Sequence, residues 1–331
     1  MNKQLIYPVF FSLSLILALH LLMVNSLAPH LVGKQIFSWL IGLGLFFVAQ
    51  QINLKQLVKY KLHILIIISI LLLIPILQKS ETRGSRRWIH MAHVQIQPSE
   101  IVRPWLTLIV SQTQQYTYLI LPLLIIFIQP DLGGVISTLS ILIPFVLYDS
   151  KLKKIAIIGT VLLLIFSPLV WHFGLHSYQK DRITFFLHPQ KDPQGKGYNL
   201  IQSKIAIGSG GFFGKGYKKG SQGQLLFLPE KHTDFIFAAM SEELGLIAVL
   251  ILFFAYYILL SSLIKKYYSK SISNQNVFSL SLAFQIWFQI FVNIGMNLGL
   301  LPVTGTPLPF MSVGGSSVMS LFFALGLVFS T

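Results

Sequence analysis

The segment Pro229 to Asp234 concentrates side chains that could bind or act on a substrate. Glu230, His232, Thr233 and Asp234 lie there, immediately before a long apolar run. An ionisable residue at a membrane edge can reach a substrate while partial desolvation tunes its pKa. The alternative is structural, because Thr233 or Asp234 could cap the next helix by accepting hydrogen bonds from its free N–H groups.

A second group of functional side chains precedes and begins another apolar run. Arg87 and Trp88 come first, and Glu100 and Arg103 follow with the i, i+3 spacing that places opposite charges on one helix face. Trp88 on its own is typical of an interfacial anchor. Glu100 and Arg103 could neutralise each other inside the membrane edge, so a structural pair and a substrate site are both open interpretations.

Three other acids stand out by position. Glu242 and Glu243 fall eight and nine residues after Asp234, which corresponds to about 12 to 14 Å along one helix. Acids at that depth are costly unless they are paired, which favours a functional role. Asp131, in the segment Gln129 to Gly134, is predicted to lie in a tight turn near the start of a helix.

The elements that must position these residues are membrane helices. Hydrophobic residues make up 54% of the 331 residues and charged residues 11%, against about 25% charged in an ordinary soluble domain. Apolar runs of the ~20 residues that cross a bilayer recur along the chain. We therefore predict an all-α, polytopic membrane protein, a single domain over residues 1–331, with about ten transmembrane helices near 7–25, 35–50, 62–78, 98–112, 116–129, 132–148, 155–173, 233–263, 277–299 and 314–330.

The connection between the seventh and eighth predicted helices, about residues 174–232, is too polar and too rich in glycine and proline to cross the membrane. Connections of this length are usually functional or disordered. In its stretch 208–216, Lys215 is followed by glycine, whereas a nucleotide-binding loop has Ser or Thr there, and no strand is predicted before it. We expect a flexible loop near the lipid headgroups.

Basic residues indicate the orientation, because short cytoplasmic loops retain Lys and Arg. Ten of them lie before the first helix or after the second, sixth and eighth, so both termini are predicted to be cytoplasmic and the long connection extracytoplasmic. The other fifteen then lie outside, where they could bind anionic lipid headgroups or a polyanionic substrate such as a lipid pyrophosphate. Five of these lie close together in the chain: Lys79, Arg83, Arg86, Arg87 and Arg103.

The predicted spans mostly lack polar groups near the membrane midplane. A transporter that carries a charged headgroup across the bilayer should have such groups at that depth. We therefore expect the chemistry to take place at one membrane interface. The sequence contains no cysteine, which excludes disulfides, iron–sulfur clusters and thiolate zinc sites.

In combination these segments resemble the SEDS family of shape, elongation, division and sporulation proteins, and its elongation branch in particular. The resemblance covers nearly the whole chain. Arg103 stands where the family usually has Lys, and Val313 replaces a usual Tyr. The resemblance rests on the shared order of short stretches at residues 84–89, 97–100, 129–133, 198–216, 227–237, 242–245, 293–296 and 301–316.

The resemblance implies a ten-helix peptidoglycan glycosyltransferase. Such an enzyme joins lipid II units into glycan strands on the outer face of the bacterial cytoplasmic membrane, beside a class B penicillin-binding protein of the elongation machinery. The family's essential acid falls on Asp234, which would be the general base of an inverting displacement. Some of Arg87, Arg103 and Lys204, with or without a divalent cation (Mg²⁺ or Mn²⁺), would stabilise the departing pyrophosphate.

The same resemblance implies further residues that contact the substrate, and no organic cofactor. With the three basic residues, the expected binding set contains Trp88, Glu100, Glu230, His232 and Thr233. A lipid II flippase, a division-specific paralogue and a non-catalytic scaffold for the penicillin-binding partner are the alternative functions.

Overall fold

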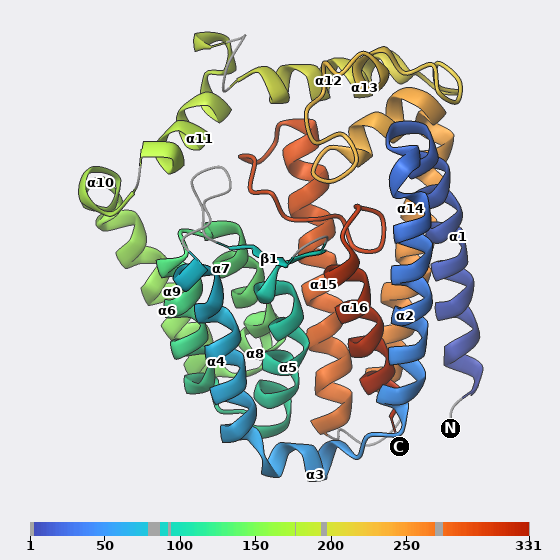
Figure 1. Ribbon diagram of the computed structural model, residues 1–331. Helices are drawn as coiled ribbons and strands as arrows, with labels where there is room; N and C mark the ends of the chain where they lie inside the picture. The colour runs from blue at the N-terminus through green and yellow to red at the C-terminus, as the bar shows by residue number, and fades with distance from the viewer. Residues whose placement is uncertain are drawn as a thin grey trace.

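The computed structural model describes residues 3–78, 87–91, 94–175, 177–192, 197–268 and 274–330. Over these ranges the chain forms a bundle of long helices with shorter helices across one end (Figure 1). The elements are α1 (Lys3–Leu27), η1 (Pro29–Leu31), α2 (Val32–Gln50), α3 (Leu54–Lys59), α4 (Lys61–Gln78), β1 (Ile89–Met91), β2 (Val94–Ile96), α5 (Pro98–Thr113), η2 (Tyr116–Leu119), α6 (Ile120–Ile128), α7 (Leu132–Leu139), η3 (Ser140–Leu142), α8 (Ile143–Tyr148), α9 (Ser150–Ile165), α10 (Ser167–Leu169), η4 (Val170–Gly174), α11 (Ser177–Leu187), η5 (Pro189–Lys191), α12 (Tyr198–Gly210), α13 (Ser221–Gln224), α14 (Ile236–Tyr268), α15 (Asn274–Leu298) and α16 (Gly315–Val328).

Each predicted span coincides with one helix or with a run of consecutive helices. Among the described residues, α1, α2 with η1, α4, α14 and α15 are long and apolar enough to cross a membrane alone. The apolar runs Tyr116–Ile128, Leu132–Tyr148 and Gly315–Val328 are shorter, and the run after Ser150 is bent by 60°. The predicted all-α, polytopic fold is confirmed, with one small β-hairpin in which Ile89 pairs with Ile96.

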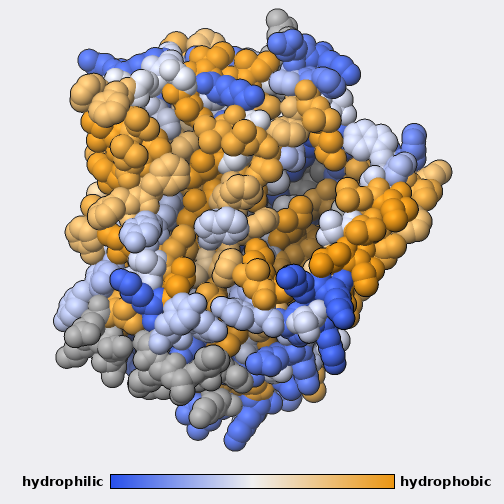
Figure 2. Space-filling view, turned by 180° about the vertical axis from the view of Figure 1, so that it is seen from behind, coloured by the Kyte–Doolittle hydropathy of each residue, from blue (hydrophilic) through white to orange (hydrophobic). Residues whose placement is uncertain are grey.

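Apolar side chains cover the middle of the molecular surface, and hydrophilic side chains gather at its two ends (Figure 2). Large apolar residues that water would not favour, such as Phe37, Ile67 and Phe127, are exposed on the helices. Backbone groups in lipid must be satisfied internally, which helices achieve. The chain is therefore a multi-pass membrane protein, and α1 begins at the end of the bundle where α16 finishes (Figure 1).

Two apolar cores hold the bundle together. The larger one joins α1, α2, α14, α15 and α16, and in it the Trp39 ring packs against Phe310 and Phe322. The smaller one joins α4, α5, α6 and α8 around Leu106. Trp105 of α5 packs against both cores, so α5 connects the two halves and carries Glu100 and Arg103 into the space between them.

The connection between the α9–η4 run and α14 has more structure than the sequence predicted. It contains α11, α12 and α13, and the last two lie across one end of the bundle (Figure 1). Stretch 208–216 was expected to be flexible, but it is packed: a Cβ atom on Gly210 would overlap the backbone of Ser241, and one on Gly214 would overlap that of Glu243. The expectation was wrong because glycine here permits the close approach of two backbones.

Helix α14 is interrupted at Gly245, which has φ 72° and ψ −167°. Only glycine adopts this conformation readily, and its position against Gly214 leaves no room for a side chain. The sequence predicted one continuous helix through this point. Glu242 and Glu243 therefore lie at a break beside the extramembrane segment 211–224, where they contact its backbone.

Polar residues do occur inside the spans, so the expectation that they are mostly absent was wrong. Helix α15 carries Ser281, Gln285, Gln289, Asn293 and Asn297, and none of them is more than 1% exposed. Four-residue spacing makes each of them the neighbour of the next in one row along the helix, here called the polar face of α15. The depth of polar groups gives no argument against a transporter.

Candidate functional site

A cavity of about 540 Å³ lies at the end of the bundle that α12 covers. Three residues of the predicted site, Arg87, Glu230 and Asp234, line it. The remaining lining comes from α11, the start of α12, the segment before α14 and the connection between α15 and α16: Asp181, Arg182, Phe185, Phe186, Asn199, Leu200, Pro229, Phe235, Val303 and Gly305.

Gly305 separates the Arg87 guanidinium from the Asp234 carboxylate. A Cβ atom on Gly305 would lie 3.0 Å from Arg87 Nη2 and 3.6 Å from Asp234 Oδ2. Gly305 has φ 74°, a left-handed conformation that favours glycine. A cation and a carboxylate thus both lie beside Gly305 in the cavity wall.

Asp131 anchors Arg87 from the protein interior. Arg87 Nη1 lies 3.2 Å from Asp131 Oδ1, and the Asp131 side chain is 1% exposed. The same carboxylate accepts a 3.0 Å hydrogen bond from the Gly134 amide and so caps α7. The predicted turn and cap are confirmed, and the contact with Arg87 is an additional role that the sequence did not indicate.

The segment that carries Asp234 is fixed by backbone contacts. The carbonyl of Glu230 accepts hydrogen bonds from the amides of Thr233 and Phe235. The Thr233 hydroxyl donates to Glu230 Oε2 at 3.0 Å. The Ser312 hydroxyl donates to the Thr233 carbonyl at 2.6 Å.

The connection before α16 also fixes His232, whose carbonyl accepts a hydrogen bond from the Val313 amide at 3.0 Å. His232, Thr233 and the half-buried Trp88 lie outside the cavity lining. Lys204 is exposed, and its ammonium end packs beside Gly299, also outside the lining. Lys79, Arg83 and Arg86, which the sequence grouped with Arg87, lie outside the described residues.

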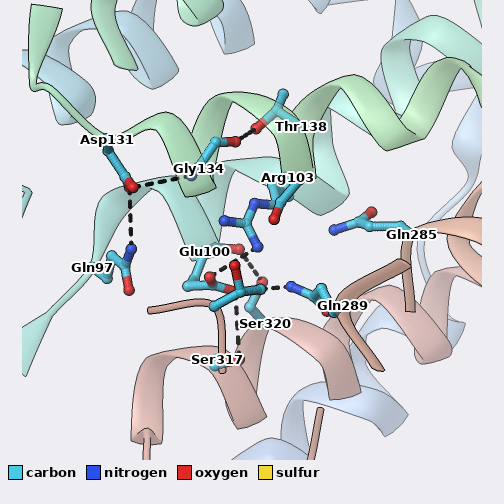
Figure 3. A network of polar contacts seen from close by, with 12 residues as sticks. Gln97, Glu100, Arg103, Asp131, Gly134, Thr138, Gln285, Gln289, Ser317 and Ser320 are labelled. Atoms are coloured by element: carbon cyan, nitrogen blue, oxygen red, sulfur yellow. Dashed lines mark hydrogen bonds and ion pairs between the residues drawn. The ribbon is translucent and has the colours of Figure 1, made fainter. Parts of the chain in front are cut away.

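Glu100 and Arg103 form the predicted ion pair, buried between helices (Figure 3), and neither residue belongs to the cavity lining. Arg103 Nη1 lies 2.8 Å from Glu100 Oε1, with the two side chains 2% and 4% exposed. Glu100 Oε2 accepts long hydrogen bonds from Gln289 at 3.5 Å and Ser317 at 3.4 Å. The pairing is confirmed, and we refer to these two residues as the buried pair.

Glu242 and Glu243 bind the extramembrane segment 211–224, an arrangement we call the carboxylate clamp. Glu242 Oε1 accepts hydrogen bonds from Lys215 at 2.6 Å and Ser221 at 3.0 Å, and both its oxygens accept from the Gln222 amide. Glu243 accepts from Ser26 of α1, Gln224 and the Lys218 amide. The clamp joins α1, α13 and α14.

Lys231 connects the clamp with the segment of Asp234. Its ammonium donates a hydrogen bond to the carbonyl of Gly223. Burial lowers the pKa of Lys231 below its ordinary value, and the Glu243 carboxylate offsets part of that effect. A partly buried lysine, three residues before Asp234, therefore contacts the backbone of the clamp.

Sequence reasoning missed the cavity residues of α11 and α12. Arg182 supplies a second guanidinium to the cavity, and its Nη1 donates to the Thr304 carbonyl at 3.3 Å. Arg182 is one of the fifteen basic residues predicted to lie outside, and nothing else in the sequence analysis singled it out. No comparable signal marks Asn199, Phe185 or Gly305.

The carboxylates of the cavity determine how a divalent cation could be bound there. Among the described residues, no group of three or more His, Asp or Glu side chains is arranged to hold a metal ion. Asp181, Glu230 and Asp234 nevertheless all line the cavity. Such single oxygen donors fit an ion like Mg²⁺, which commonly binds through one or two carboxylates, water and substrate phosphates.

Comparisons with known proteins agree on one family. The family model for FtsW, RodA and SpoVE, described as cell cycle protein, matches residues 2–331. Peptidoglycan glycosyltransferase MrdB of Escherichia coli is 40% identical over 265 residues, which cover 75% of this chain and 71% of that protein. The probable peptidoglycan glycosyltransferase FtsW of Coxiella burnetii is 34% identical over 349 residues, covering 95% and 92%.

Solved structures share the fold over nearly the whole length. A chain of a peptidoglycan synthase complex that coordinates polymerization and crosslinking superposes with a TM-score of 0.81 at 28% identity, covering 98% of this chain and 96% of that one. The rod shape determining protein RodA of Thermus thermophilus gives a TM-score of 0.69 at 25% identity, covering 97% and 94%.

Proposed function

This chain belongs to the FtsW, RodA and SpoVE family of cell cycle proteins and is a peptidoglycan glycosyltransferase, and we propose that it joins lipid II units at the cavity of Arg87 and Asp234. The observation that carries the proposal is the meeting of these two side chains across Gly305. Sugar transfer from a pyrophosphate requires a base and an anion-binding group in the same place. Similarity to MrdB and RodA favours the elongation role.

The proposed reaction is a single inverting displacement. Asp234 accepts the proton of the acceptor sugar hydroxyl while the hydroxyl oxygen forms a bond to the anomeric carbon of the donor. The bond from that carbon to the pyrophosphate oxygen breaks on the opposite face, and the lipid pyrophosphate leaves with the electron pair. An α-linked donor thus gives a β-linked glycan.

Two guanidinium groups support the leaving pyrophosphate in this proposal. Arg87 is held by Asp131, and Arg182 is tied to the Thr304 carbonyl, so both are anchored before a substrate arrives. Arginine presents paired N–H donors that match phosphate oxygens. Preorganised charge of this kind acts where negative charge develops in the transition state.

A divalent cation remains part of the proposal. Asp181 and Glu230 are the cavity acids that would hold Mg²⁺ or Mn²⁺ while Asp234 acts as the base. When bound, the ion would neutralise the charge of the departing pyrophosphate. Removing the ion with a chelator and restoring each metal in turn measures this contribution directly.

We propose that the protein lies in a bacterial cytoplasmic membrane with the cavity outside and both termini inside, as the lysines of the inner loops favour. A class B penicillin-binding protein is the proposed partner, since the structural relative belongs to a complex that couples polymerization to crosslinking. An apolar groove on α14 and α15, lined by Phe253, Trp287 and Phe291 among others, suits one transmembrane helix of that partner.

The test is lipid II polymerisation by purified Asp234→Asn protein in detergent. Asparagine keeps the size of the side chain and its ability to cap a helix but removes the basic carboxylate. We expect a loss of about 10²- to 10⁴-fold in glycan synthesis, with an unchanged melting temperature. Asp234→Glu should also be poor, because a displacement of about 1 Å can cost on the order of 10²-fold.

The same assay separates the alternatives. An Asn variant within a few-fold of wild type would show that Asp234 caps α14 and that the base lies elsewhere. A flippase moves its substrate without forming a glycosidic bond, so it would make no glycan, and a scaffold would make none without an active partner enzyme. Wild-type polymer formed by this chain alone would exclude both alternatives.

A further inference from the structure

The polar face of α15 ends next to the residue proposed as the base. Asn293 and Asn297 are the two members nearest the cavity end of the helix, and both are fully buried. Buried amides inside a membrane bundle are costly unless their donors and acceptors are used. Their hydrogen bonds therefore identify what this end of α15 holds.

Both asparagine amides donate to the backbone of Asp234. The Asp234 carbonyl accepts a hydrogen bond from Asn293 Nδ2 at 3.2 Å and another from Asn297 Nδ2 at 3.0 Å. Asn293 Nδ2 also donates to the carbonyl of Thr306 at 2.9 Å. Thr306 follows Gly305, so one side chain connects the residue that carries the base with the loop that separates it from Arg87.

Asn297 also fixes the start of the helix that follows Asp234. Its Oδ1 accepts a hydrogen bond from the Ala238 amide at 3.3 Å. Ala238 lies in the first turn of α14, where backbone N–H groups have no partner within the helix. The Ser203 hydroxyl of α12 donates to the Asn297 carbonyl at 2.8 Å, so the cavity wall from α12 is attached at the same point.

We infer that Asn293 and Asn297 are positioning residues that fix the Asp234 carboxylate relative to Arg87. The inference rests on the proposed role of Asp234. An amide is required at both positions because each uses donors that a carboxylate lacks, and Asn297 also uses an acceptor. Neither side chain lines the cavity, so they act through Asp234 and not on the substrate.

The test compares Asn293→Leu and Asn297→Leu with Gln285→Leu in the lipid II polymerisation assay. Gln285 lies on the same polar face, is equally buried and accepts a hydrogen bond from Thr107 at 3.0 Å. It is 12 residues from Asn297, or about 18 Å along the helix. All three variants lose one buried amide, but only two lose a contact with Asp234. Rates are measured well below the lowest melting temperature of the set.

Each asparagine variant should lower kcat by about 10- to 10²-fold with KM changed less than about threefold, because a shift of about 1 Å in a catalytic group has an effect of this size. Gln285→Leu should keep kcat within about threefold. Wild-type kcat in the asparagine variants, or an equal loss in Gln285→Leu at a similar melting temperature, would overturn the inference.

Two additions keep the result interpretable. Asn297→Ser retains a donor and an acceptor and is the variant to use if the leucine variants do not fold. Its kcat should fall by about three- to tenfold. A wild-type rate for Asn297→Ser contradicts the inference. Asp234→Asn is assayed in parallel. If it is active, the proposed base is wrong, whereas an inactive Asp234→Asn beside fully active asparagine variants rejects only the positioning role.

Discussion

The carboxylate clamp and the buried pair both contain acids shielded from solvent, yet their hydrogen bonding differs. The Glu242 side chain accepts from an ammonium, a hydroxyl and backbone amides, most at 2.6 to 3.1 Å. From the described part of the chain, the Glu100 side chain receives only the 3.4 and 3.5 Å hydrogen bonds and the Arg103 contact. Among the described residues, Arg103 Nε and Nη1 have no hydrogen bond with good geometry.

The difference follows from what surrounds each site. A turn of backbone wraps the clamp, and the amides of Lys218, Gln222 and Gly223 donate hydrogen bonds to the two carboxylates. Helix side chains surround the buried pair, and their spacing is set by packing in two cores. The clamp has therefore used its hydrogen-bonding capacity, whereas the pair retains some. Buried hydrogen-bonding groups without partners call for a specific explanation. One explanation is that Glu100 and Arg103 change their hydrogen-bond partners during turnover.

The largest expected effect comes from breaking the clamp through its backbone. Gly210→Ala would drive a methyl group into the backbone of Ser241 and Glu242, neither of which can move without displacing α14. We expect a loss of at least about 3 kcal/mol in stability, measured as a lower melting temperature or as loss of folded protein.

Gly208→Ala is the matched control for that change. Gly208 lies in the same helix, and a Cβ atom there would meet no other atom within 4 Å. Alanine favours helix over glycine by up to about 1 kcal/mol, so this variant should be neutral or slightly more stable. Equal destabilisation by both alanines would show that α12 and α14 are not tightly packed and that the clamp is not rigid.

These sites also show how far sequence reasoning reaches. Hydrophobic run length located the helices, because lipid imposes a minimum span that sequence displays directly. The i, i+3 spacing of Glu100 and Arg103 identified their pairing, because residues three apart are neighbours on a helix. The break at Gly245 was missed, although a glycine after two acids in a helix pattern could have suggested it.

Contacts between distant segments were beyond the sequence. Asn297 reaches Asp234 across 63 residues, and Glu243 reaches Ser26 across 217. No local sequence pattern predicts either contact, because each depends on how whole helices pack. Lys204 shows the converse: its charge and its place in the outer connection suggested a site residue, but its side chain packs beside Gly299 away from the cavity.

A smaller effect is expected in the coupling energies of the two ion pairs, Glu100 with Arg103 and Glu242 with Lys215. Double-mutant cycles on Glu100→Gln with Arg103→Gln should give a coupling of about 2 to 3 kcal/mol, because each single change leaves an unpaired buried group. The cycle on Glu242→Gln with Lys215→Met should give less than about 1 kcal/mol. Lys215 is 30% exposed, and Glu242 keeps its other donors without it.

Melting temperatures of the four single and two double variants provide both couplings. A clamp coupling as large as that of the buried pair would mean that Lys215 is the principal partner of Glu242, and the backbone amides would lose their assigned importance. Additive effects at Glu100 and Arg103 would mean that their 2.8 Å contact contributes nothing to stability.

The smallest expected effect is that of Arg103→Lys. Arg103 Nη1 is close to Glu100 Oε1 but poorly aligned for a hydrogen bond, and Nε has no partner among the described residues. A lysine ammonium can rotate three donors toward the carboxylate, and it removes the unsatisfied Nε–H group. The gain in alignment offsets the loss of the guanidinium plane, so stability should change by less than about 1 kcal/mol. The measurement is the melting temperature of Arg103→Lys beside those of wild type and Arg103→Gln. A lysine variant as unstable as the glutamine variant would show that the planar guanidinium itself is required. The buried pair would then depend on its hydrogen-bond geometry as closely as the clamp does.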